Sequence, residues 1–146
     1  FMAPDDMPTA IRDFLRRTGQ PQPDGPAEMT RLILESLALS YRYALDRIGG
    51  ILNRTYRTLH IVGGGSLNTL LCQLTADAAG LTVKAGPVEA TVMGNLLVQA
   101  YARGFIESPQ DIRRIAGRSA DMRTYEPRER SRWEDRYGAY RDMLEG

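Results

Sequence analysis

The chain has 146 residues, enough for one domain with a hydrophobic core, and its hydrophobic (42%) and charged (25%) shares are typical of a globular protein. A formal net charge of +1 argues against a nucleic-acid-binding surface, and no apolar run resembles a membrane span or a signal peptide. The single Cys72 cannot form an internal disulfide, which predicts a cytoplasmic protein.

The first third of the chain predicts two helices. A short helix is expected over residues 8–18, and a loop over 20–25 follows because its two prolines disfavour helix. The longest helix is expected over 26–48 and is apolar round most of its circumference, which predicts burial on several sides. Gly49 and Gly50 are expected to end it.

The next stretch predicts a strand, a glycine turn and a helix. Residues 59–62 are apolar and rich in branched side chains, which is typical of a buried strand. Gly63, Gly64 and Gly65 follow directly, and Ser66 is a suitable N-cap for the helix. The apolar positions of that helix recur at helical spacing: Leu67, Leu70, Leu71, Leu74 and Ala78.

A second short strand is expected over 81–85, parallel to the first with a right-handed crossover. A turn at Gly86 leads to a helix over 89–103, in which Gly94 indicates close packing or a close ligand. The predicted inner face of this helix is Val92, Met93, Leu96, Leu97, Ala100 and Tyr101.

The last forty or so residues predict two more helices. Ser108 to Asp111 forms a capping box for a short helix that Gly117 should end, and residues 118–127 are expected to be irregular. A charged surface helix follows over 128–144, held down by Trp133, Tyr137, Tyr140 and Leu144.

Two parallel strands among several helices make an α/β class with an incomplete sheet. The sequence also begins with Phe1-Met2 rather than with a methionine, so we expect it to be a piece of a longer protein.

The glycine turn is the strongest candidate site. It lies at the carboxyl end of a strand and before a helix, where α/β proteins bind ligands, and residues without Cβ let a flat or anionic ligand reach the backbone. A purely geometric role for the glycines is an equal alternative. Any side chain at Gly64 is expected to intrude on a ligand or to strain the turn. Asn68 stands where a dinucleotide fingerprint needs its last glycine, and the only lysine, Lys84, rules out a P-loop.

No catalytic constellation or metal site is predicted. The only histidine, His60, lies in a strand, and Asp77 and Glu89 are single carboxylates at helix positions. Asp77 is expected to face solvent or a helix partner, and Glu89 suits the first turn of a helix. No Cys/His cluster has ligand spacing, so the pattern is a nucleotide-type cradle without a reaction centre.

Two stretches resemble motifs of one family. Residues 60–74, HIVGGGSLNTLLCQL, resemble the adenosine motif of the FGGY carbohydrate kinases. Residues 85–95, AGPVEATVMGN, resemble the motif that follows it, and the helix around 35–41 is similar too. The resemblance runs from about Asp6 to Ser108 and thins out afterwards.

The resemblance implies part of an actin-like, ribonuclease-H-like ATPase domain in a cytoplasmic enzyme of carbohydrate metabolism. It implies that Gly63, Gly64 and Gly65 lie against ATP or ADP and that Asn68 reaches the adenine from the first turn of the helix. Gly94 would belong to a helix at an interdomain hinge. The catalytic aspartate, the sugar-binding residues and a first phosphate loop would lie in an N-terminal portion outside this chain, and Mg²⁺ would serve the complete enzyme.

We therefore expect the adenosine-binding portion of a kinase that phosphorylates a ketose such as L-rhamnulose. The alternatives are a non-catalytic actin-like assembly domain and, less favoured, a dinucleotide-binding oxidoreductase module. Residues 1–25 would form a first helix and loop, 26–104 the adenosine-binding α/β core, and 105–146 the C-terminal helices. The chain alone is expected to be inactive and to self-associate, because it exposes strand edges and the long apolar helix.

Overall fold

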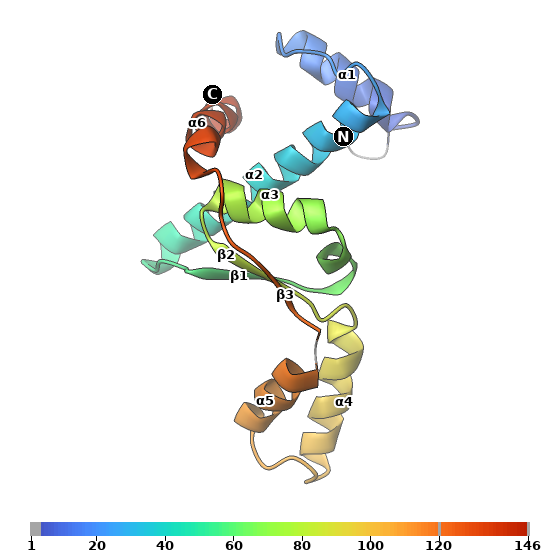
Figure 1. Cartoon of the computed structure of the whole chain (residues 1–146), viewed down its shortest axis with the longest axis vertical. Helices are drawn as coiled ribbons and strands as arrows, with labels where there is room; N and C mark the ends of the chain where they lie inside the picture. Colours follow the sequence, from blue (N-terminus) through green and yellow to red (C-terminus); the bar gives the residue numbers. More distant parts are fainter. Residues whose placement is uncertain (1–3, 120, 146) are drawn as a thin grey trace.

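The computed structural model describes residues 4–119 and 121–145, which form a helix-rich α/β arrangement around a small sheet (Figure 1). Its helices are α1 (Met7–Arg17), α2 (Pro26–Leu52), the 3₁₀ helix η1 (Gly63–Leu67), α3 (Thr69–Ala79), α4 (Ala90–Ala102), α5 (Pro109–Ser119) and α6 (Arg130–Glu145). Its strands are β1 (Thr58–Ile61), β2 (Thr82–Ala85) and β3 (Arg123–Tyr125). Within the described residues, no helix combines the length and the apolar character needed to cross a bilayer.

The sheet has the order β1-β2-β3, with β1 and β3 at its edges. The predicted parallel pair is confirmed, since Thr58 lies opposite Thr82 and Ile61 opposite Ala85. The prediction of an irregular 118–127 segment is wrong, because β3 lies within it and runs antiparallel to β2. The sheet is therefore mixed and still small.

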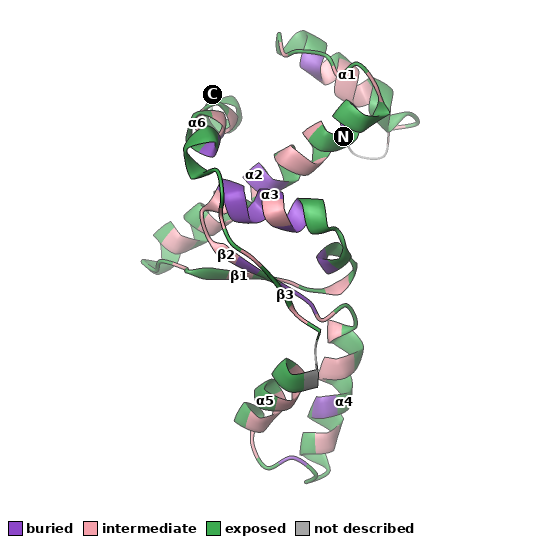
Figure 2. Cartoon of the chain, viewed as in Figure 1, coloured by how far each residue is buried: buried purple, intermediate pink, exposed green. Residues whose placement is uncertain are grey.

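α3 is the centre of the molecule and lies between the sheet and two other helices (Figures 1 and 2). One buried cluster joins α3 to α2 and α6: Ala38, Leu39, Leu74, Ala78, Trp133 and Tyr137. A second cluster joins α3 to the sheet: Cys72, Ala76, Val83 and Ala85. α3 is therefore covered on two faces from Leu71 onward, whereas its first residues Thr69 and Leu70, next to the glycine turn, are exposed.

α2 does not end at Gly49-Gly50, as the sequence predicted, but runs to Leu52 and is capped by Asn53 in the left-handed region. A Cβ at Gly49 would lie 2.8 Å from the carbonyl oxygen of Arg54. This glycine therefore allows a close approach of the following loop instead of ending the helix. The predicted burial of α2 on several sides is also wrong for the described chain, because only Met29, Ala38 and Leu39 of α2 are buried.

α4 and α5 pack on each other and project away from the sheet (Figures 1 and 2). The predicted inner face of α4 is only partly covered: Leu97 is buried, whereas Val92, Leu96 and Tyr101 are exposed. The first half of the capping box before α5 is confirmed, because the Asp111 N–H donates to Ser108 Oγ at 3.2 Å, and the Asp111 carboxylate accepts from the Ser108 hydroxyl at 2.8 Å. The helix continues past Gly117 to Ser119, so the predicted end at that glycine is wrong.

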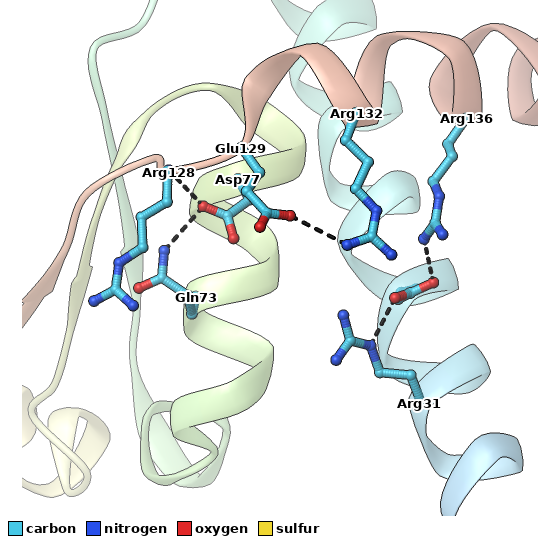
Figure 3. Close-up of polar contacts among 8 residues, drawn as sticks. Arg31, Gln73, Asp77, Arg128, Glu129, Arg132 and Arg136 are labelled. Atoms are coloured by element: carbon cyan, nitrogen blue, oxygen red, sulfur yellow. Dashed lines mark hydrogen bonds and ion pairs between the residues drawn. The ribbon is translucent and has the colours of Figure 1, made fainter.

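α6 is held on α2 by aromatic burial and by polar contacts. Trp133 and Tyr137 are buried, as predicted, but Leu144 is exposed. The Tyr137 hydroxyl donates to Asp46 at 2.6 Å, and burial first and this bond second raise the pKa of Tyr137 far above its ordinary value. In Figure 3, Arg136 of α6 and Arg31 of α2 both contact one carboxylate, that of Glu35, each at 2.6 Å.

Candidate functional site: the glycine turn

The glycine turn follows the carboxyl end of β1 and is tied to the loop after β2. Gly63 donates its N–H to the carbonyl of Pro87 at 3.0 Å, and Gly86 donates to the carbonyl of Ile61 at 2.8 Å. The two stretches that resemble family motifs therefore meet in space, which the sequence did not show. The turn is a 3₁₀ helix, not the start of the α-helix, so Ser66 is not the N-cap of α3.

The three glycines of the turn differ in their surroundings. Gly63 has a φ of +73°, a conformation that side chains with a Cβ rarely adopt. Gly64 and Gly65 are exposed, and no heavy atom lies within 4 Å of a Cβ placed at Gly64. The expectation that a side chain at Gly64 strains the turn is therefore wrong, because that residue has an ordinary φ and open space. Its open side leaves room for a flat or anionic ligand.

Asn68 lies one residue before α3 and is its N-cap. Its Oδ1 accepts a hydrogen bond from the Leu71 N–H at 2.9 Å, and its φ and ψ of −81° and 90° are extended. The implied place in the first turn of the helix is corrected to the cap position. The residue is exposed and its Oδ1 is engaged by the helix, so the amide NH₂ is the part of the side chain that remains available as a donor.

The comparison with known families shows to which family this chain belongs. The profile described as "FGGY family of carbohydrate kinases, C-terminal domain" matches residues 1–103 and so includes the turn and the loop beside it. The chain belongs to the FGGY family of carbohydrate kinases.

A relative in Bacteroides thetaiotaomicron, named rhamnulokinase, is 43% identical to this FGGY chain over 144 residues. The alignment covers 99% of this chain and 30% of the relative. The chain thus spans about a third of the length of the relative that it matches. The similarity extends over α5, β3 and α6, beyond the part that the family profile matches.

Other polar residues of this FGGY chain have structural roles. Asp77 is buried, and its Oδ1 accepts bonds from the Arg128 N–H at 2.7 Å and from Gln73 Nε2 at 2.9 Å (Figure 3). It therefore fixes the segment before α6 on α3, which confirms the expected helix partner and excludes the solvent-facing position. Glu89 is the N-cap of α4 without a side-chain cap bond, and His60 is exposed on edge strand β1.

The remaining candidates add no reactive group to the turn. Within the described residues, no three His, Cys, Asp or Glu side chains gather in a way that could hold a metal ion. Burial raises the pKa of the Cys72 thiol, which keeps it protonated and unreactive. A Cβ at Gly94 would have no neighbour within 4 Å, so packing among the described residues does not require this glycine. The geometry of the site supports binding and positioning.

Proposed function

We propose that this chain is the adenosine-binding portion of an ATP-dependent kinase that phosphorylates a ketose such as L-rhamnulose. The observation that carries the proposal is the exposed glycine turn at the carboxyl end of β1, in a chain that belongs to a family of carbohydrate kinases. The choice of sugar rests on the name of the relative from Bacteroides thetaiotaomicron. The enzyme would act in the cytoplasm, where the free Cys72 stays reduced.

In this proposal Gly63, Gly64 and Gly65 lie against the nucleotide, and the amide of Asn68 contacts the adenine. ATP would supply the phosphoryl group and would carry Mg²⁺ with it. We assign no residue of this chain to the metal. Phosphoryl transfer depends chiefly on positioning and electrostatic stabilisation, and this chain would contribute positioning. The small α/β sheet with covering helices fits part of an actin-like ATPase domain, with residues 26–104 as the adenosine-binding core.

Two other functions make different predictions. A non-catalytic actin-like assembly domain would bind nucleotide. The protein expressed from the complete reading frame would then release no ADP in response to sugar. A dinucleotide-binding oxidoreductase is disfavoured because Asn68 replaces the last fingerprint glycine and because the chain belongs to a kinase family. The 146-residue chain alone is expected to show no turnover, since we assign no catalytic base to it.

Replacing Asn68 tests the proposed base contact. Asn68→Ser keeps an N-cap oxygen for Leu71 but removes the amide, so we expect a higher KM for ATP and a weaker preference for adenine over guanine nucleotides. A lost buried hydrogen bond of about 1–3 kcal/mol sets the scale of the effect. The measurement is nucleotide kinetics on the protein expressed from the complete reading frame.

Asn68→Ala is the matched variant. It should lose the same base preference and also about 1 kcal/mol of stability, because the helix loses its cap. An unchanged KM and an unchanged base preference in Asn68→Ser would remove Asn68 from the nucleotide site.

A further inference from the structure

Three successive glycines give the turn little order of its own. Glycine loses more conformational freedom on folding than other residues do, and Gly64 and Gly65 are exposed. A disordered loop would have to be fixed when the nucleotide binds, and that ordering cost is subtracted from the affinity. The contacts that order the turn before binding therefore matter for its function.

Ser66 closes the turn from the inside. Its Oγ donates to the carbonyl of Gly63 at 2.6 Å, and the residue is only 6% exposed. Gly63 is itself anchored, because its N–H donates to the Pro87 carbonyl at 3.0 Å. The Ser66 hydroxyl thus binds Gly63, the residue that attaches the turn to the loop at Pro87.

α3 also contacts the backbone of Gly65 and Ser66 through Cys72. The Sγ of the fully buried Cys72 lies 3.8 Å from the carbonyl oxygen of Gly65 and 3.9 Å from that of Ser66. Because Ser66 is buried against this helix, bulk water does not readily replace the hydroxyl when it is removed. The Ser66 side chain is buried and bonded to the Gly63 carbonyl, so it does not face the open space at Gly64.

We propose that Ser66 is a positioning residue for the nucleotide. Its hydroxyl orders the glycine turn in the free protein, so that the exposed backbone of Gly64 and Gly65 meets the ligand without first having to be fixed. The inference rests on the proposed function for the identity of the ligand, and it assigns Ser66 no contact with that ligand.

Ser66→Ala tests this role in the protein expressed from the complete reading frame. We expect the KM for ATP and the Kd for ADP to rise about fivefold, the equivalent of one net hydrogen bond, with kcat unchanged. Amide hydrogen exchange across residues 63–67 should become faster without ligand. Ser66→Cys keeps a weaker donor of similar size and should give intermediate values.

Thr75→Val is the matched control. It also removes a buried hydroxyl, whose Oγ1 donates to the Leu71 carbonyl at 2.7 Å, but this bond lies inside α3. It should leave ADP affinity and exchange across 63–67 unchanged.

The outcomes separate the two proposals. If wild-type protein binds no ADP, the proposed function fails, and the nucleotide role of Ser66 fails with it. If wild-type protein binds ADP but Ser66→Ala has the same Kd or the same exchange rates, only the inference about Ser66 is overturned. An equal loss of ADP affinity in Thr75→Val also overturns it, because general stability would then explain the effect.

Discussion

Gly63 and Gly64 are adjacent in the turn, but each has its own reason to be a glycine. Gly63 has a φ of +73°, a backbone conformation that favours glycine, whereas Gly64 has an ordinary φ and open space around its Cα. Of these two residues, Gly63 alone needs to lack a side chain in the folded chain. The open space at Gly64 is consistent with the proposed nucleotide site.

This difference predicts opposite results for two variants. Gly63→Ala should destabilise the fold by about 1–2 kcal/mol, the cost of a left-handed conformation for a residue with a Cβ. Gly64→Val should leave the unfolding midpoint close to that of the wild type and abolish nucleotide binding. Urea unfolding and titration calorimetry measure the two effects, and normal ADP affinity in Gly64→Val would mean that the nucleotide binds elsewhere.

At the same scale, the sequence identified the turn but not its internal bonds. Ser66 and Asn68 are both good N-cap residues, and the pattern of apolar residues did not show which one begins α3. The choice depends on the 3₁₀ geometry of the three glycines, and glycine permits several backbone conformations at equal cost. Asp77 was also hard to place, because its partners include the Arg128 backbone, 51 positions away in the sequence.

Among the elements, the helices and the parallel pair of β1 and β2 were predicted, whereas β3 and the ends of α2 and α5 were not. β3 has only three residues, Arg123, Thr124 and Tyr125, and its charge and small size hide the strand pattern. It forms because its backbone pairs with β2, a contact between distant parts of the chain. α2 and α5 continue through Gly49 and Gly117, because a single glycine costs a helix only about 1 kcal/mol relative to alanine.

The contact between α2 and α6 predicts a dependence of stability on pH. Arg42 donates to the Glu134 carboxylate at 2.7 Å, and this bond holds the pKa of Glu134 below its ordinary value of 4.5. The contribution is complete above that ordinary value and is lost as the pH falls through the lower pKa of the folded state. It is small, because Glu134 is largely exposed to solvent.

We therefore expect Glu134→Gln to lower the urea midpoint at neutral pH, and this difference from the wild type should shrink as the pH is lowered below 4.5. Asp135→Asn is the control, since Asp135 lies beside Glu134 on α6 but makes no ion pair within the described chain. A difference that stays constant with pH would show that the Arg42–Glu134 contact contributes nothing to stability.

On the scale of the whole molecule, many large apolar side chains are exposed among the described residues. A groove of about 780 Å³ between α1, α2 and α6 is lined largely by apolar side chains, including Ile33 and Leu37. Further along α2, Ile48, Ile51 and Leu52 are also exposed. Large exposed apolar patches usually mark association sites in soluble proteins.

We propose that the 146-residue chain associates with a second copy through α2. Light scattering should give a mass above 16.3 kDa that rises with concentration. Leu37→Glu should shift the chain toward the monomer, whereas Thr30→Glu, which adds the same charge at an exposed polar position of α2, should not. A monomeric wild-type chain at high concentration would rule out the association.

Two segments of the chain that lead to the α4–α5 pair lie close together at Gly86. A Cβ at Gly86, just before α4, would lie 2.7 Å from the carbonyl oxygen of Asp121, so the two chain segments that lead to the pair touch there. The same Gly86-Pro87 segment holds the glycine turn through its bonds to Ile61 and Gly63. The short Gly86-Pro87 segment therefore links the start of the α4–α5 pair directly to the backbone of the glycine turn.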